Sequence, residues 1–589
     1  MRLLFYVLIL MPAVGITQTF VDSAIQLGIN HFYSDLSPTG GVSFYDFNDD
    51  GWDDLTFATD QDSLIQFYIN RDGTYEKINL NIDNKETVMQ ILWADYDNDG
   101  DQDLYVNAYE GINRLYQNQG DLQFIDVTEA SGLPLETFLS YGACWGDYNR
   151  DGYLDLYVQE RKGPQLAAEN RNRLYRNNGD GTFTEVTDLS NTAALGKKPF
   201  CAAFADFNND LWPDLYIAND KLTGNTLLIN QGDGTFLDAG TISGAEPEMN
   251  AMCVAIGDYD SDGWQDIYIT NTEEGNQLLR NEGTSSSDQP TFEDVSVKTG
   301  TDFGGIGWGS NFLDADNDGD LDLYVSGMQV GLDVITSGLY ENNGSGNFTK
   351  RPTFDGDTVI SHSNAIGDVN NDGYPDIAVS NFVPYPAQLW VNQGAENNWL
   401  KIELQGVVSN RDGIGSKIEI FHGSQYQQRL TFCGIGFLGQ NSKTEIFGTG
   451  SSLTIDSIII TWPTGHRDKL YSIATNQKIQ IVEGSTTNGD IFVDPAIEQM
   501  TTATRASTEK NQFRLHVYPN PNHNHLMIDF EQQIPVHLEI HGNSGDLMFH
   551  SENLKTVMII NTSHWPSGTY LISIIDQKGH RNSALWIKH

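Results

Sequence analysis

Seven stretches of this chain concentrate carboxylates in one pattern, D-x-[DN]-x-D-G-x-x-D, with a single departure at the glycine position. The first stretch begins at Asp46 and the last at Asp368. Side chains at positions 1, 3, 5 and 9 supply oxygen atoms, and position 7 supplies a backbone carbonyl. Hard oxygen donors in this number suit Ca²⁺, which takes about six to eight oxygen ligands. The pattern therefore predicts up to seven Ca²⁺ ions as cofactors, one for each stretch.

Each acidic stretch is interpreted as a loop with five candidate metal ligands. The predicted metal ligands are Asp46, Asn48, Asp50, Trp52 and Asp54 in the first loop; Asp95, Asp97, Asp99, Asp101 and Asp103 in the second; Asp147, Asn149, Asp151, Tyr153 and Asp155 in the third; Asp206, Asn208, Asp210, Trp212 and Asp214 in the fourth; Asp258, Asp260, Asp262, Trp264 and Asp266 in the fifth; Asp314, Asp316, Asp318, Asp320 and Asp322 in the sixth; and Asp368, Asn370, Asp372, Tyr374 and Asp376 in the seventh.

Two other interpretations of these stretches are weaker. Asp, Asn and Gly also favour plain hairpin turns, but a turn needs only one or two acidic residues. Carboxylates crowded this closely would repel one another without a counter-ion. The stretches are not EF-hand loops, because position 12 holds Phe57 and Val106 in the first two copies where an EF-hand has Glu. A strand pattern follows each loop, which places the sites at β-hairpins.

The fourth loop has Leu211 at the glycine position. Glycine there permits the positive φ that wraps the chain around an ion. A side chain held at positive φ costs ~1–2 kcal/mol. We therefore predict that this loop is either a weaker site or rearranged.

The acidic loops begin 49 to 59 residues apart, so one supersecondary unit is repeated. Each unit has a strand such as Leu104–Val106, a second strand ending in Asn before a Gly-rich turn, and a third with Phe-x-Asp/Glu-Val, as at 183–186. A fourth strand, rich in small residues, precedes the next loop. Four short strands in each repeat indicate a β-propeller blade. We predict seven blades over residues 19–398.

The sequence also predicts how the ring closes. No Phe-x-Asp strand follows the seventh loop, whereas 19–22 at the start of the mature chain has this pattern. Pairing this N-terminal strand with the last blade would leave no large exposed edge.

The loops and their Leu/Ile-Tyr-Val strands resemble the FG-GAP/VCBS repeats of integrin-like propellers. This resemblance extends over the seven predicted blades. It implies structural calcium on the blade hairpins and does not imply catalysis.

The charge balance limits the possible partners. The chain has 80 Asp and Glu against 33 Lys and Arg, a net charge of −47. Seven Ca²⁺ ions would leave about −33, which still disfavours nucleic acid and anionic membranes as partners. Cys144, Cys201 and Cys253 lie just before acidic loops, and we predict buried thiols there rather than disulfides.

The N-terminus, residues 1–18, has the charged, apolar and small-residue regions of a secretory signal peptide. Its apolar run is too short for a membrane span, and no other segment qualifies. Residues 485–512 form a Ser/Thr/Asn-rich linker.

Residues 399–484 resemble the ASPIC/UnbV domain, a module that commonly follows VCBS propellers. The resemblance rests on 398–400, 409–415, 447–450 and 462–465. Arg411 and Asp412 within it have residue types that could do chemistry, but a turn-stabilising pair is the favoured interpretation.

Residues 513–589 resemble the type A sorting domain of the type IX secretion system. The resemblance rests on Tyr-Pro-Asn-Pro at 518–521 and Trp-Pro-Ser-Gly-Thr-Tyr at 565–570. It implies export through the type IX machinery to the outer surface of a Bacteroidetes-type cell. An ordinary β-sandwich binding module is the alternative.

Together these features predict an all-β chain: a seven-bladed β-propeller followed by two small β-sandwich-like domains. The leading function is a secreted or surface-attached, calcium-binding propeller that binds a protein or glycan ligand. The alternative is an extracellular polysaccharide lyase or hydrolase with its site in the channel mouth. No nucleophile motif, zinc motif or isolated carboxylate pair stands out to support it. A scaffold without a specific ligand is a third possibility.

Overall fold

The structure is a computed structural model that describes residues 20–33, 40–82, 84–161, 170–284, 289–328, 337–354, 357–486 and, nearer the C-terminus, 514–518, 525–531, 537–541, 547–551, 557–561, 565, 568–575 and 581–588. The predicted signal peptide, almost all of the predicted linker and the Pro-Asn-Pro motif lie outside the described residues.

The first 28 strands form seven four-stranded blades, as the repeats predict. The first three blades contain β2 (Val42–Phe44), β3 (Leu55–Phe57), β4 (Gln66–Arg71) and β5 (Thr74–Ile78); β6 (Thr87–Ala94), β7 (Asp103–Gly111), β8 (Arg114–Asn118) and β9 (Phe124–Asp126); and β10 (Phe138–Gly146), β11 (Asp155–Arg161), β12 (Arg173–Asn177) and β13 (Phe183–Glu185). The fourth and fifth contain β14 (Pro199–Ala205), β15 (Asp214–Asn219), β16 (Thr226–Asn230) and β17 (Phe236–Asp238); and β18 (Val254–Gly257), β19 (Asp266–Ile269), β20 (Gln277–Thr284) and β21 (Pro290–Asp294). The last two contain β22 (Ile306–Leu313), β23 (Asp322–Met328), β24 (Gly338–Asn342) and β25 (Phe348–Arg351); and β26 (Ser361–Gly367), β27 (Asp376–Asn381), β28 (Gln388–Asn392) and β1 (Phe20–Asp22). Single helical turns are α1 (Thr187–Ser190), α2 (Gly240–Ser243), α3 (Ser296–Thr299) and η2 (Pro352–Phe354).

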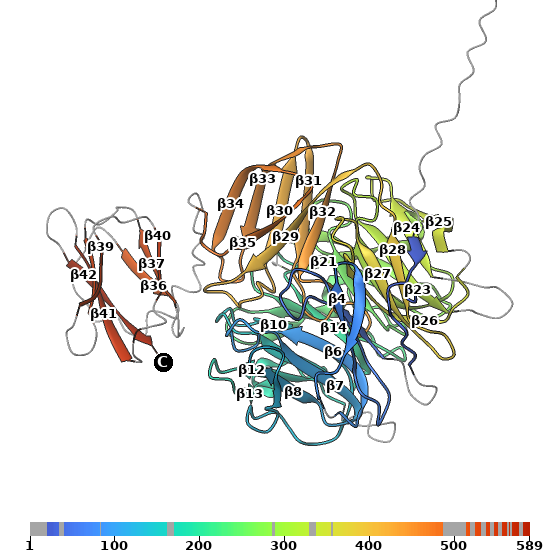
Figure 1. Ribbon diagram of the computed structural model, residues 1–589, viewed down its shortest axis with the longest axis horizontal. Helices are drawn as coiled ribbons and strands as arrows, with labels where there is room; N and C mark the ends of the chain where they lie inside the picture. The colour runs from blue at the N-terminus through green and yellow to red at the C-terminus, as the bar shows by residue number, and fades with distance from the viewer. Residues whose placement is uncertain are drawn as a thin grey trace, which may run out of the picture.

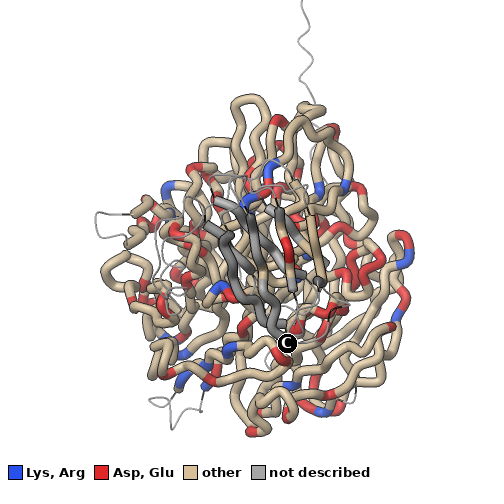
Figure 2. Tube along the Cα trace, turned by 90° about the vertical axis from the view of Figure 1, so that its left-hand side faces the viewer, with Lys and Arg blue, Asp and Glu red and all other residues tan. Residues whose placement is uncertain are grey.

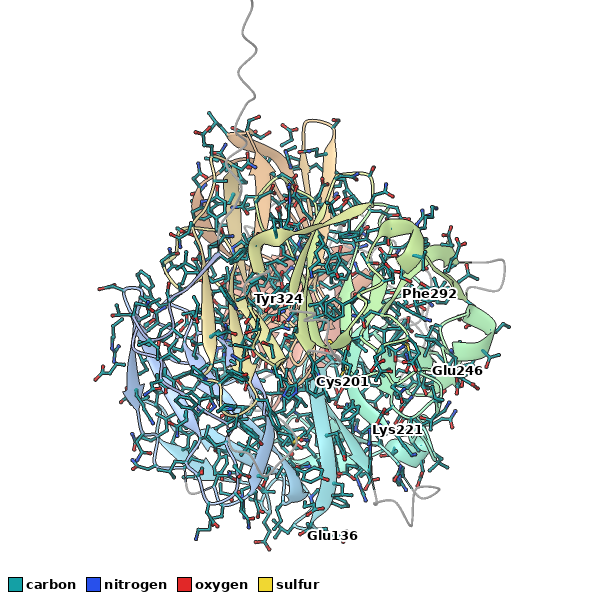
Figure 3. The ribbon with its side chains drawn as sticks, turned by 90° about the vertical axis from the view of Figure 1, so that its right-hand side faces the viewer. Glu136, Cys201, Lys221, Glu246, Phe292 and Tyr324 are labelled. Atoms are coloured by element: carbon teal, nitrogen blue, oxygen red, sulfur yellow. The ribbon has the colours of Figure 1, made fainter. Side chains whose placement is uncertain are left out.

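The innermost strands close a ring. Strands β2, β6, β10, β14, β18, β22 and β26 contact one another in this order, and β26 contacts β2. The N-terminal strand β1 pairs antiparallel with β28, with Phe20 opposite Asn392. This pairing confirms the predicted closure by the N-terminal strand. Figure 3 shows Cys201 on the inner strand β14 near the centre and Glu136 at the periphery.

The second strand of each blade is buried on both faces because blades pack face to face. In β7, Leu104 and Val106 are fully buried and Tyr105 is 2% exposed. This environment explains the continuous apolar Leu-Tyr-Val runs, because strands covered on both sides do not alternate with polar residues. The four cysteines are buried and free, as predicted for Cys144, Cys201 and Cys253.

Residues 398–486 form a second domain, here called the cap, with two packed sheets (Figure 1). One sheet has the order β32-β29-β35 and the other β31-β30-β33-β34. The strands are β29 (Asn398–Gln405), β30 (Lys417–His422), β31 (Gln425–Leu430), β32 (Thr444–Gly450), β33 (Thr454–Thr461), β34 (Arg467–Ala474) and β35 (Gln477–Val482). Ile418, Ile458 and Trp462 belong to its own hydrophobic core.

Residues 431–443, between β31 and β32, leave the cap and run into the centre of the propeller ring; they are here called the plug segment. The amide of Trp145 on β10 donates to the carbonyl of Cys433 at 3.0 Å, and the amide of Gly436 donates to the carbonyl of Val254 at 3.0 Å. The amide of Gln440 donates to the carbonyl of Val42 at 3.2 Å. The plug segment therefore joins the inner strands of three different blades by main-chain hydrogen bonds.

The C-terminal strands form a separate group (Figure 1). Sheet β36-β37-β40 contains β36 (Arg514–Tyr518), β37 (His525–Glu531) and β40 (Val557–Asn561), and sheet β39-β38-β41-β42 contains β39 (Leu547–Ser551), β38 (His537–His541), β41 (Gly568–Ile575) and β42 (Arg581–Lys588).

Candidate metal centres

Each acidic loop joins the innermost strand of a blade to the second strand, and the loops share one hydrogen-bonding pattern. In the second loop the carboxylate of Asp95 accepts the amide of Asp99 at 3.0 Å through Oδ1 and the amide of Gly100 at 2.8 Å through Oδ2. The amide of Asp101 donates to Asp99 Oδ1 at 2.9 Å. These bonds turn the side chains of positions 1 and 5 toward the inside of the loop.

The aspartate at position 9 ties its loop to the blade. Asp103 Oδ1 accepts the amide of Asn118 at 2.8 Å, and Oδ2 accepts the amide of Tyr96 at 3.3 Å. The asparagine that ends each third strand has a further role. The side-chain amide of Asn177 donates to the carbonyl of Tyr96 in the preceding blade at 2.8 Å. This bond between blades explains why the repeat places Asn before its Gly-rich turn.

Neighbouring loops are also linked directly. The side chain of Asn98, at position 4, donates to the carbonyl of Gly152 in the third loop at 2.9 Å. Asn371 donates in the same way to Gly51 across the ring closure at 3.1 Å. Position 4 is left-handed in every loop, with φ of 60° at Asn98. Asn209 and Asn317 make the same contact with Gly263 and Gly373, so position-4 side chains link four pairs of neighbouring loops at one end of the propeller.

Loop four keeps this conformation despite its leucine. Leu211 has φ of +73°, and its amide donates to Asp206 Oδ2 at 2.8 Å, as the glycine does in the other loops. The amide of Asp210 donates to Asp206 Oδ1 at 3.1 Å. The loop is therefore not rearranged. Leu211 instead adopts a positive φ, which is sterically unfavourable for a residue with a side chain.

The oxygen atoms of the loops converge. In the second, fifth and sixth loops, the aspartates at positions 1, 3 and 5 bring carboxylate oxygens within 4.8 Å of one another. They are Asp95, Asp97 and Asp99; Asp258, Asp260 and Asp262; and Asp314, Asp316 and Asp318. The other four loops have Asn at position 3. An all-oxygen set of this density fits Ca²⁺ better than zinc or copper, which favour nitrogen and sulfur ligands.

Electrostatics also fit a bound cation. Burial is the main reason that the pKa values of Asp46 and Asp258 rise to about 7 in the protein alone. Asp54 Oδ2 is buried and has no hydrogen-bond partner among the described residues. A divalent cation supplies the missing partner and favours the ionised form. Figure 2 shows acidic segments, in red, distributed over the propeller.

The cap covers the acidic loops with basic side chains, which sequence reasoning did not anticipate. Lys401 Nζ on β29 lies 2.9 Å from Asp368 Oδ2 and 2.7 Å from Asn371 Oδ1 in loop seven. The side chains of Lys401 and Asp368 are 3% and 0% exposed. Lys443, at the end of the plug segment, forms an ion pair with Asp49 of loop one. Lys401 alternates with apolar residues in Leu400–Leu404 in the same way as Glu403 does, so the sequence did not single it out.

Arg411 and Asp412 contact the propeller rather than stabilising a local turn. The carboxylate of Asp412 accepts the amide of Asp95 at 2.9 Å and the side chain of Gln102 at 2.9 Å. The amide of Arg411 donates to Asn98 Oδ1 at 2.8 Å. The predicted structural role is therefore right in kind, but its partners lie in the second acidic loop, some 310 residues earlier in the sequence.

A second surface lies at the opposite end of the channel. Inner strands end at the acidic loops, and aromatic residues stand near their beginnings. Tyr141 and Phe200 are partly buried, with ring centroids 5.1 Å apart, and the Arg161 guanidinium lies 4.0 Å from the Tyr141 ring. Trp308 lies 5.3 Å from Phe437 of the plug segment. The plug segment therefore reaches this aromatic mouth.

Three family models match this chain. The FG-GAP-like repeat model matches residues 46–106, 95–158, 166–217, 206–269, 258–325 and 334–379, which together make up more than half of the chain. The ASPIC and UnbV model matches residues 406–488. The model of a secretion system C-terminal sorting domain matches residues 516–588. Such a sorting domain directs a protein to the cell surface or the exterior and implies contact with the secretion machinery.

Known proteins match parts of the chain. Cartilage acidic protein 1 of Homo sapiens is 26% identical over 185 residues, which are 30% of this chain and 27% of that protein. The Xenopus tropicalis protein is 24% identical over 189 residues, which are 31% of this chain and 28% of that protein. The match thus spans less than a third of these relatives.

A solved rhamnogalacturonan lyase of Bacillus licheniformis aligns with a TM-score of 0.33 at 13% identity, covering 64% of this chain and 76% of that one. This likeness is too distant to carry an argument about function. In the part of the chain that the structure describes, no helix has the length and apolar character to cross a membrane.

Proposed function

Since the chain belongs to the FG-GAP-like repeat family and carries an ASPIC/UnbV domain and a C-terminal sorting domain, we propose that it is an exported, calcium-stabilised propeller that binds a protein or glycan ligand. The observation that carries the calcium assignment is the shared geometry of the loops. The carboxylate at position 1 accepts the amides of positions 5 and 6 in all seven loops, as Asp46 does from Asp50 and Gly51 and Asp258 does from Asp262 and Gly263. Bound Ca²⁺ would neutralise the loop carboxylates and hold each hairpin closed.

The test of the calcium assignment is direct. The protein is first stripped of metal with a chelator and then titrated with Ca²⁺ in a calorimeter. The titration should show several binding events, with up to seven Ca²⁺ ions bound per chain. Asp99→Ala and Asp151→Ala should each lower this stoichiometry by about one, since each removes a charged ligand. A protein that binds no Ca²⁺ would refute the assignment.

We place the ligand-binding surface at the aromatic mouth. Aromatic faces stack on the apolar faces of sugars and on apolar side chains, and the Arg161 guanidinium holds the Tyr141 ring in place. The opposite end of the channel is covered by the cap, so the loops there face the chain itself. This arrangement favours recognition at the far mouth.

A glycan array and a panel of polysaccharide-degradation assays separate binding from turnover. Tyr141→Ala and Trp308→Ala should abolish the binding of any ligand identified on the array. Tyr471→Ala is the matched control, because Tyr471 is an exposed aromatic residue on the cap strand β34. Thermal melts of all three variants establish that they are folded. Equal binding by wild-type protein and the two mouth variants would exclude this surface.

The enzyme alternative requires space in the channel mouth. At the acidic end, Gln440 of the plug segment is 1% exposed and its side chain bonds Ser43 Oγ at 2.9 Å. The chain itself thus fills the place where a substrate would enter from that side. This argues for a binding protein, and turnover in the degradation panel would reverse the choice.

A further inference from the structure

In loops six and seven the cap contacts Oδ2 of the first aspartate, whereas Oδ1 accepts the amide of position 5 of its own loop and is the oxygen left for an ion. In loop seven Asp368 Oδ2 accepts both the amide of Gly373, at 2.8 Å, and Lys401 Nζ, at 2.9 Å. In loop six Asp314 Oδ2 accepts the amides of Gly319 and Gly448, each at 3.0 Å. The cap and an ion enclosed by the loop therefore do not compete for one oxygen.

The charges of loop seven balance only when ion and cap are both present. Its three carboxylates, Asp368, Asp372 and Asp376, carry −3, and Ca²⁺ reduces this charge to −1. The ammonium of Lys401, buried against Asp368, brings the total to zero. Without the ion the buried carboxylates of the loop have Lys401 as their basic partner but no divalent counter-charge, which favours opening of the loop and displacement of the atoms that the cap contacts.

The packing between the cap and the loops leaves no room for a displaced loop. Gly373 lies so close to the Trp399 ring that a Cβ atom there would be 2.0 Å from it. A Cβ atom at Gly152 would be 2.3 Å from the carbonyl oxygen of Val408. A loop that shifts by an ångström therefore loses its contact with the cap.

We propose that the cap is held on the propeller by calcium: the ion-closed loops are the surface that the cap recognises, and the cap with its plug segment detaches when the ions are removed. The partner that fits the acidic face is therefore the cap of the same chain, which presents Lys401, Lys443 and Arg411 to the loops. This inference rests on the proposed calcium binding and adds that ion binding and cap docking are thermodynamically linked.

Cutting the chain between the propeller and the cap tests the linkage. Ala395 and Glu396 lie in the exposed connection between β28 and β29, so a protease recognition site can be inserted between them. The folded, full-length protein is cleaved in about 1 mM Ca²⁺ and then divided between buffers with Ca²⁺ and with excess chelator. Size-exclusion chromatography should show one complex in Ca²⁺ and two fragments in chelator.

Two matched pairs of variants identify the contacts. Lys401→Met should raise the fraction of released cap in Ca²⁺ at least about tenfold, since it leaves Asp368 buried without its partner. Lys469→Met, on the outer cap strand β34, should leave that fraction unchanged. Gly373→Ala should release the cap more than Gly51→Ala, because both glycines have positive φ but nothing lies within 4 Å of a Cβ atom at Gly51.

Calorimetric Ca²⁺ titration of the uncut protein separates the two claims. Fragments that stay together equally in Ca²⁺ and chelator, in a protein that binds Ca²⁺, would overturn the linkage and leave the calcium assignment standing. Fragments that separate in both buffers would overturn it as well. A protein that binds no Ca²⁺ would overturn both proposals.

Discussion

At the scale of single residues, the glycine of the acidic loops provides a left-handed backbone without steric cost. Leu211 adopts the same left-handed backbone as the glycines, with φ of +73° against +90° at Gly51. Its amide still donates to the first aspartate of the loop. The hydrogen bonds of the loop therefore overcome the steric cost of a side chain at positive φ, which is ~1–2 kcal/mol.

Leu211→Gly should stabilise the protein against urea by up to about 1 kcal/mol. The change removes the strain at Leu211, partly offset by the greater freedom of glycine in the unfolded chain. Leu189→Gly, at an exposed position of α1, should destabilise the protein instead. A loss of stability in both variants would show that Leu211 is not strained.

Two buried histidines should make stability depend on pH. Burial lowers the pKa of His362 to about 3, and burial together with the charge of Lys77 lowers the pKa of His31 to about 3. The unfolded chain takes up these protons near pH 6.5, whereas the folded chain does not. Stability is therefore complete above pH 6.5 and falls toward pH 3, by about 1.4 kcal/mol per pH unit for each histidine.

Between pH 6 and 4, His362→Gln should make the free energy of unfolding depend less steeply on pH. The slope should fall by about 1.4 kcal/mol per pH unit, which corresponds to one proton. Urea titrations at several pH values in saturating Ca²⁺ measure this slope. Gln425→Ala, which removes an exposed side chain without a titratable group, is the control and should leave the slope unchanged. An identical slope in the wild type and His362→Gln would mean that His362 is protonated in the folded protein.

At the scale of elements, the plug segment occupies the centre of the propeller ring and contacts its inner strands. Gln440 is its most connected side chain: Oε1 accepts the amide of Trp93 at 2.8 Å, and Nε2 donates to the carbonyl of Trp93 at 2.7 Å. Phe437 and Leu438 pack with Met89 on β6 and with Met252, which lies just before β18. A single segment of the cap thus joins blades that are not neighbours in the ring.

Gln440→Ala should destabilise the protein by about 3 kcal/mol, because it leaves the amide and carbonyl of Trp93 buried without these partners. Gln425→Ala removes an exposed glutamine from the same domain and should cost almost nothing. Urea unfolding monitored by tryptophan fluorescence compares the two variants. Equal, small losses would show that the plug segment contributes little to stability.

At the scale of the whole molecule, the net charge is −47, and the acidic loops that contribute to it meet basic side chains of the cap. Lys401, Lys443 and Arg411 come from the cap, and each faces an acidic loop of the propeller. Two kinds of positive charge can therefore neutralise the acidic loops: basic side chains of the cap and the predicted Ca²⁺ ions. Loops one and two also border an open polar cavity of about 260 Å³, through which ions can reach them.

Chelation should lower the melting temperature. With about 1 mM Ca²⁺ and a Kd of about 0.1 mM, each site contributes about 1.4 kcal/mol, and seven independent sites contribute roughly 10 kcal/mol. Scanning calorimetry with and without chelator measures the shift. Mg²⁺ should restore less than Ca²⁺ does, because it requires a smaller octahedral site. A melting temperature unaffected by excess chelator would contradict calcium stabilisation.

The sequence alone determined the repeated unit and its closure. The acidic loops recur at a nearly constant period, and their spacing predicts the blades because each local segment carries its own strand and turn signals. Phe20–Asp22 was recognisable as the missing outer strand for the same reason, and it pairs with β28. The candidate ligands follow from the loop pattern, since all five of each loop lie within nine consecutive residues.

Only the tertiary structure decided how the cap and the propeller fit together. Lys401 and Asp368 are 33 residues apart, and Gln440 and Trp93 are 347 apart. No local pattern relates such positions, because their contact exists only when the closed ring and the cap are packed together. The sequence also gave no reason to expect the plug segment, since residues 431–443 have neither strand periodicity nor a charge pattern and are ordered only by the channel around them.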